Sequence, residues 1–162
     1  MHAVVAGLSP GADTDTIVRA LLDIEEIKQL KARYFRLLDT RRWDEWAQLF
    51  TVDCELRTMP DPDEVQTGRE DFAAFVRSVI TPGISVHHGH MPEITLTGPD
   101  SAEGAWAMSD YVEATEGAAF PMTLKGYGHY LETYRREPEG WRIASLQLTR
   151  LRVDDVAAPR TE

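Results

Sequence analysis

The chain has 162 residues, of which 43% are hydrophobic and 27% charged, and this is the composition of one ordinary globular domain. Its 27 acidic and 17 basic residues give a formal net charge of −10, which argues against a nucleic-acid partner because such proteins present a basic face. No apolar run is long enough to cross a membrane, and no secretory signal pattern opens the sequence.

The predicted elements begin with a long amphipathic helix over residues 14–38, in which apolar side chains recur every three or four positions. Asp13 or Asp15 stands where it can cap the start of this helix. The next predicted elements are a short helix over 43–50, a strand over 52–58 and a third helix over 69–80.

Long strands dominate the second half of the chain, and glycine- and proline-rich turns separate them. Their predicted ranges are 84–97, 102–116, 119–136 and 141–153. Helices followed by long antiparallel strands are typical of an α+β fold with the helices on one face of a curved sheet. We therefore predict a single domain over 14–153, with flexible tails at 1–13 and 154–162 and one pocket enclosed by the sheet and helices.

Two polar residues break the apolar pattern of the first predicted helix, one within it and one just after it. Tyr34 lies in the apolar stripe, so its hydroxyl needs a partner inside the protein. Asp39 follows at the end of the helix, close to Arg41 and Arg42. One interpretation of Asp39 is a turn carboxylate paired with these arginines, and the other is a carboxylate of a functional site.

Two of the strands carry a charged residue on an otherwise apolar face. Asp110 shares its face with Trp106 and Met108, and a carboxylate is costly to bury without a partner. It is either an acid at the edge of a strand or a site residue. Alternation places Arg150 on the same face of the last strand as Leu148. Arg150 lies either at a solvated strand end or at the wide end of the pocket.

Three histidines stand close together in the first long strand. Alternation places His88 and His90 on one face and His87 on the other. A metal site is one alternative, because imidazole is a common ligand, but no further ligand stands at a matching spacing. The pattern favours one pocket histidine and two that are packed or exposed, without deciding which is which.

A histidine with a carboxylate behind it and a tyrosine in front is an acid–base arrangement. The carboxylate fixes the imidazole tautomer, and the tyrosine donates a hydrogen bond to a developing oxyanion. No Gly-x-Ser-x-Gly motif and no glycine-rich phosphate loop is present in the sequence, so neither nucleophilic catalysis nor a nucleotide cofactor is indicated.

The order of Tyr34-x4-Asp39, a tryptophan-rich second helix, His-His-x-x-x-Pro-x-Ile from His87 and a late Trp-Arg-Ile resembles the SnoaL-like branch of the nuclear transport factor 2-like superfamily. The resemblance covers about residues 14–153. Its site spacing is most similar to that of the bacterial bile-acid 7α-dehydratases, which use Tyr, Asp, His, Asp and Arg in this order. The matching positions are Tyr34, Asp39, His87, Asp110 and Arg150.

The resemblance implies a cone-shaped, cystatin-like α+β barrel and a site without cofactor or metal. It implies that His87 removes a proton activated by a carbonyl, that Asp110 orients and charges His87, and that Tyr34 with Asp39 polarises the carbonyl. Arg150 would hold an anionic or oxygenated end of the substrate. The other residues expected to contact substrate are Tyr130, Trp106 and Met108.

These features predict a dehydratase for a hydrophobic, hydroxylated and carbonyl-activated polycyclic substrate, such as a steroid or polyketide. The alternatives are a double-bond isomerase or cyclase for a similar substrate, and a ligand-binding module without catalysis. An apolar outer face that includes Val86 and Ile94 predicts a homo-oligomer, a dimer or a trimer as in relatives. The single Cys54 cannot form an internal disulfide and fits a cytoplasmic location.

Overall fold

The computed structural model describes residues 7–8, 11–58 and 65–155, and these contain three helices and six strands. In chain order the elements are α1 (Thr14–Asp39), α2 (Trp43–Ala47), β1 (Phe50–Arg57), β2 (Gln66–Thr67), α3 (Arg69–Ile80), β3 (Gly83–Gly98), β4 (Ser101–Ala114), β5 (Met122–Glu137) and β6 (Gly140–Asp155). Every predicted helix and strand is confirmed, with ends shifted by a few residues, and only β2 is unexpected. The predicted tails lie largely outside the described residues.

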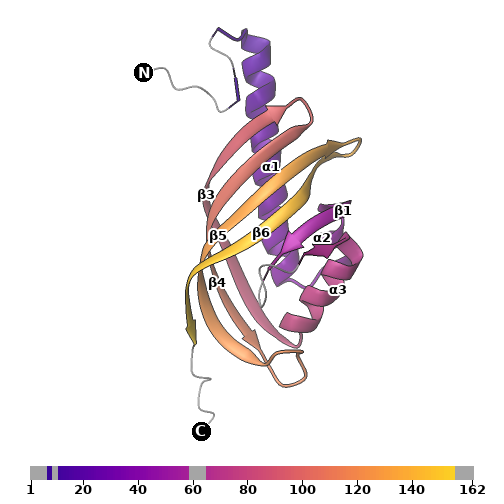
Figure 1. Ribbon diagram of the computed structural model, residues 1–162, viewed down its shortest axis with the longest axis vertical. Coiled ribbons are helices and arrows are strands. Elements are labelled where there is room, and N and C mark those ends of the chain that lie inside the picture. The colour runs from indigo at the N-terminus through magenta and orange to yellow at the C-terminus, as the bar shows by residue number, and fades with distance from the viewer. Residues whose placement is uncertain (1–6, 9–10, 59–64, 156–162) are drawn as a thin grey trace.

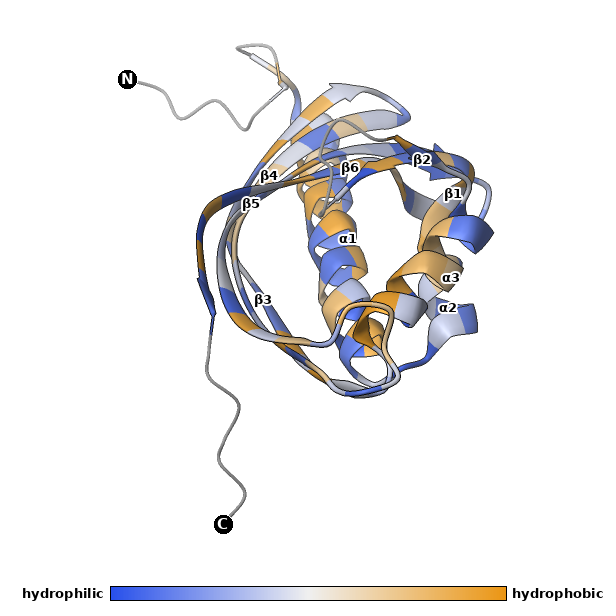
Figure 2. Cartoon of the chain, turned by 60° about the horizontal axis from the view of Figure 1, so that its bottom comes forward, coloured by the Kyte–Doolittle hydropathy of each residue, from blue (hydrophilic) through white to orange (hydrophobic). Residues whose placement is uncertain are grey.

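The strands form one sheet in the order β2-β1-β6-β5-β4-β3, in which only β1 and β6 pair in parallel among the described strands. The long strands curve around α1 (Figure 1). Figure 2 shows α1 inside the curve of the sheet, with α2 and α3 beside it and α3 next to β1. This arrangement confirms the predicted α+β cone. None of the described helices is long and apolar enough to cross a membrane.

Helix α1 turns one stripe of side chains toward the sheet. Asp13 is the capping residue, since its carboxylate accepts a hydrogen bond of 2.9 Å from the backbone N–H of Thr16. The buried stripe then follows the helical repeat and consists of Ala20, Ile27, Leu30, Lys31, Tyr34, Leu37 and Leu38. A lysine and a tyrosine within this stripe bring polar groups into the interior of the cone.

The C-terminal end of α1 is a Schellman turn. The backbone N–H of Arg42 donates to the carbonyl of Leu37 (3.0 Å), and that of Arg41 donates to the carbonyl of Leu38 (3.1 Å). Arg41 takes the left-handed position of this turn, with φ 61°. Glycine usually occupies that position, because a side chain there costs roughly 1–2 kcal/mol. The turn leaves Asp39, the last helical residue, beside β3.

Strand β3 contains a bulge that changes which residues face inward. His90 and Met91 lie together opposite the single residue Ala107 of β4, and both are exposed. The bulge shifts the alternation by one residue. Val86, before the bulge, is 41% exposed, whereas Ile94, after it, is only 7% exposed. The predicted outer position is therefore confirmed for Val86 and wrong for Ile94.

Candidate active site

A cavity of about 340 Å³ lies between the inner face of the sheet and helices α1 and α3. Its walls are mostly apolar, with Phe72, Phe75, Val76 and Val79 from α3 and Phe120, Met122 and Leu124 from β5 and the segment before it. Its polar lining residues are Tyr34, Thr58, His87, Asp110, Tyr130 and Arg150. The fold thus brings together four of the five polar residues that the resemblance selected, together with Tyr130, and places Asp39 behind His87.

Asp39 is the carboxylate that orients His87. Its Oδ1 lies 2.6 Å from Nδ1 of His87, and its Oδ2 accepts a hydrogen bond of 2.8 Å from the backbone N–H of the same residue. An ionised carboxylate only accepts hydrogen bonds, so the neutral ring carries its proton on Nδ1. The lone pair is then on Nε2. This is the arrangement of a general base at the wall of a cavity.

Asp110 has a different partner from the one expected. It lies opposite His87 in the β3–β4 register, but its two oxygens accept hydrogen bonds of 2.8 and 2.7 Å from the guanidinium of Arg150. The Asp110 side chain is 2% exposed and that of Arg150 is 16% exposed. The predicted role of Asp110 in orienting His87 is therefore wrong, because the end of α1 places Asp39 there. The positive charge of Arg150 is therefore paired with the carboxylate of Asp110.

Two tyrosines supply hydroxyl groups to the cavity. The rings of Tyr34 and Tyr130 lie edge to face with centroids 5.9 Å apart, and both residues are buried. Burial raises the pKa of both phenols above its usual value, and the negative charge of nearby acidic groups adds to this effect. Both hydroxyls therefore remain protonated, and each has a proton that it can donate in a hydrogen bond.

A buried ion pair that sequence reasoning missed lies beneath the tyrosines. The Lys31 ammonium pairs with Glu132, and both side chains are fully buried. The ammonium also lies 3.8 Å from the ring centroids of Tyr34 and Tyr130. Burial lowers the pKa of Lys31, and the negative charge of Glu132 opposes that shift. A lysine within the apolar stripe of α1 is the sequence signal that points to this pair.

Trp106 and Met108 face inward as expected but do not line the cavity. The indole N–H of Trp106 donates a hydrogen bond of 2.8 Å to the hydroxyl oxygen of Tyr134, whose own proton goes to Glu132. The sulfur of Met108 lies 3.7 Å from Nη1 of Arg150. Trp106 and Met108 therefore contact other buried residues near the site, and the prediction that they contact substrate is not supported by the lining of the cavity.

The remaining histidines of β3 and the cysteine lie away from the cavity. His88 and His90 are exposed on the outer face of the sheet. Within the described ranges, no three His, Cys, Asp or Glu side chains converge in a way that could hold a metal ion. Burial raises the pKa of Cys54 to about 11, so its thiol stays protonated near neutral pH.

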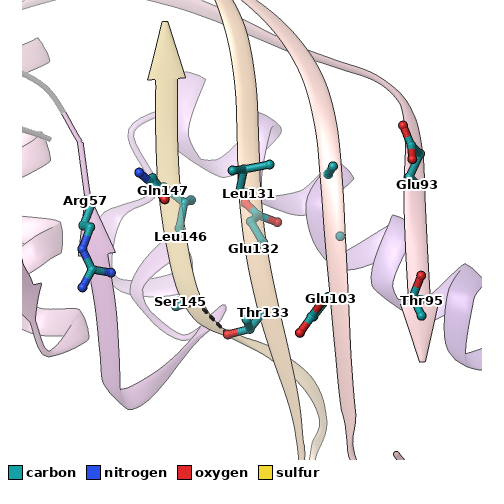
Figure 3. A pocket seen from close by; sticks show the side chains of 12 residues that line it. Arg57, Glu93, Thr95, Glu103, Leu131, Glu132, Thr133, Ser145, Leu146 and Gln147 are labelled. Carbon is teal, nitrogen blue, oxygen red and sulfur yellow. Dashed lines mark hydrogen bonds between the residues drawn. The ribbon is translucent and has the colours of Figure 1, made fainter. Parts of the chain in front are cut away.

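The outer face of the sheet has a hollow of its own, of about 470 Å³ (Figure 3). Its walls include Glu93, Thr95, Glu103, Leu131, Thr133 and Gln147, and no histidine or tyrosine is among the described residues that line it. Glu93 and Glu103 are exposed to solvent. The inner cavity is therefore the better candidate site, because burial and paired polar groups occur together there.

Gly126 makes room for the Asp110–Arg150 pair. A methyl group on Gly126 would lie 1.9 Å from Nη1 of Arg150 and 2.3 Å from Oδ1 of Asp110. Gly126→Ala is therefore expected to separate the pair and to lower the free energy of unfolding by about 1–3 kcal/mol. Denaturant unfolding measures this loss. In the background Asp110→Ala/Arg150→Ala, which removes both side-chain ends that the methyl group would meet, the loss should shrink, and equal losses in both backgrounds would contradict the steric explanation.

The comparisons with known proteins agree with this fold. A model of the SnoaL-like domain matches residues 19–147. "Probable cyclase FGR4" of Gibberella zeae is 25% identical over 134 residues, which is 77% of this chain and 89% of that protein.

Two solved structures share the fold. A candidate scytalone dehydratase from Novosphingobium aromaticivorans aligns with a TM-score of 0.75 and 22% identity, over 93% of this chain and 100% of the other. Hexachlorocyclohexane dehydrochlorinase LinA-type3 from Novosphingobium barchaimii aligns with a TM-score of 0.72 and 17% identity, over 88% of this chain and 95% of the other.

Proposed function

Because the chain belongs to the SnoaL-like domain family, we propose that it is a cofactor-independent acid–base enzyme of the lyase or isomerase type, and specifically a dehydratase. The observation that carries this proposal is the His87–Asp39 pair at the wall of an apolar cavity. The His87 side chain is only 8% exposed at the wall of this cavity and its tautomer is fixed, and such a base is suited to removing a proton from carbon.

The proposed reaction begins when a ketone oxygen accepts hydrogen bonds from Tyr34 and Tyr130. Nε2 of His87 removes the proton next to the carbonyl, and the electrons of the broken C–H bond pass into an enolate that the tyrosine hydroxyls stabilise. The enolate then collapses and expels a β-hydroxyl group, which takes the proton back from His87. One water leaves, one carbon–carbon double bond forms, and His87 returns to its starting state.

The walls of the cavity support a neutral and hydrophobic substrate. Arg150 is the only lysine or arginine among the cavity-lining residues that the structure describes, and Asp110 already neutralises it. Of the expectation that Arg150 holds an anionic or oxygenated end of the substrate, this pairing favours the oxygenated end. Aromatic and branched side chains of α3 and β5 cover the remaining surface, which suits a flat, hydroxylated ketone such as a steroid or polyketide.

The names of the related proteins support the same chemical class. Cyclisation, dehydration and dehydrochlorination can each begin with a proton taken from carbon by a base. The reactions differ in the step after proton removal, which is ring closure in one case and the loss of water or of chloride in the others. An isomerase is the alternative, and it would return the proton from His87 to another carbon of the same substrate.

The test is a turnover screen of the purified protein against hydroxylated 3-keto steroids and β-hydroxy ketones of polyketide type. Mass spectrometry is expected to show loss of one water. An unchanged mass with a shifted ultraviolet spectrum would establish the isomerase instead. Ligand-induced thermal stabilisation without any product would contradict catalysis and favour a binding module.

A further inference from the structure

The side chain of Arg41 makes hydrogen bonds beyond the turn in which the residue lies. Its backbone takes the left-handed position that glycine fills with less strain, with φ 61°. Its guanidinium donates hydrogen bonds to the carbonyls of Leu38 (2.9 Å), Gly83 (3.1 Å) and Ile80 (3.3 Å) and to the hydroxyl oxygen of Ser85 (2.7 Å). An arginine at this point therefore connects the ends of α1 and α3 to the start of β3.

The bond to Ser85 has a fixed direction, and this direction leads to the active site. A guanidinium can only donate, so the oxygen of Ser85 accepts from Arg41 and its own proton points elsewhere. That proton goes to Oδ1 of Asp39, 2.9 Å away. The same Oδ1 accepts the Nδ1 proton of His87 at 2.6 Å. An oriented chain of hydrogen bonds thus runs from Arg41 through Ser85 and Asp39 to His87.

We propose that Arg41 and Ser85 are positioning residues that fix the Asp39 carboxylate and, through it, the tautomer of His87. This inference deepens the proposed function and rests on it. Asp39 ends α1, where the partial negative charge of the helix terminus disfavours a carboxylate, and its side chain is 21% exposed. Without the hydrogen bond from Ser85, the remaining hydrogen bonds to the carboxylate from the described residues would all come from His87.

The competing explanation is that Arg41 only ties three elements together. The variant Ser85→Ala distinguishes the two explanations. It removes the hydroxyl that links Arg41 to Asp39 and leaves the three hydrogen bonds from Arg41 to backbone carbonyls in place. Arg41→Gly removes the guanidinium while easing the backbone turn, so this variant is expected to fold. Arg42→Ala is the matched control, since the Arg42 side chain binds the exposed Glu45 and does not reach the site.

The experiment is heteronuclear NMR of the His87 ring nitrogens near neutral pH, without substrate. In the wild type and in Arg42→Ala, the neutral His87 ring is expected to carry its proton on Nδ1. In Ser85→Ala and Arg41→Gly, the ring should be a mixture of the Nδ1–H and Nε2–H tautomers. With a substrate found by the turnover screen, kcat should fall by about 10–100-fold in both variants while KM stays nearly constant.

The outcomes separate this inference from the proposed function. A wild-type ring protonated on Nε2, or an unchanged Nδ1–H tautomer in Ser85→Ala and Arg41→Gly, would overturn the inference. If Arg41→Gly lowered only the thermal midpoint, Arg41 would be a structural tie. A changed tautomer in a protein that turns over no substrate would support the positioning chain and count against the proposed enzyme.

Discussion

Replacing His87 with alanine is expected to lower kcat by about 10²–10⁴-fold while the protein keeps its fold. The variant loses the only imidazole that lines the cavity among the described residues. Asp39 keeps the hydrogen bonds from the Ser85 hydroxyl and from the backbone N–H at position 87, so its carboxylate remains satisfied. Steady-state kinetics on a substrate from the screen measures the loss, and circular dichroism checks the fold.

The neighbouring residue supplies the control for this prediction. His88 lies in the same strand but faces outward and is exposed. His88→Ala should therefore turn over substrate at the wild-type rate. An active His87→Ala variant, or equal losses in the two variants, would show that the imidazole beside Asp39 is not the base.

The elements of this fold were predictable because their signals are local. Helix α3 begins and ends at the predicted residues, Arg69 and Ile80, since the apolar period and the flanking glycine and proline all lie within or beside the segment. The bulge at His90 and Met91 was not predictable in this way. It depends on how β3 pairs with β4, and so the orientation of Ile94 was assigned to the wrong face.

The members of the site were predictable, but their pairing was not. The resemblance selected Tyr34, Asp39, His87, Asp110 and Arg150, but it implied that Asp110 orients the imidazole, and the structure places Asp39 there. Asp39 and His87 are 48 positions apart, and their contact depends on where the last turn of α1 meets β3. Alternation correctly placed Asp110 on the inner face, but the reach of the Arg150 side chain decides its partner.

Replacing Lys31 with methionine is expected to lower the free energy of unfolding by about 3–5 kcal/mol. The variant leaves the carboxylate of Glu132 fully buried without its cation, although the hydroxyl of Tyr134 still donates to it. The uncompensated charge costs more than methionine recovers by filling the space. Denaturant unfolding measures the loss. In Arg42→Met, which breaks a half-exposed pair with Glu45, the loss should be within about 1 kcal/mol.

The double variant Lys31→Met/Glu132→Gln identifies the cause of that loss. Glutamine keeps an acceptor oxygen for Tyr134 and removes the charge, so the double variant should recover most of the stability. If it stayed as unstable as the single variant, the loss would come from the contact of Lys31 with the Tyr34 and Tyr130 rings rather than from an unpaired charge. If the double variant does recover its stability, its kcat tests a second point. A fall in kcat would show that the tyrosine hydroxyls need the Lys31 cation next to their rings.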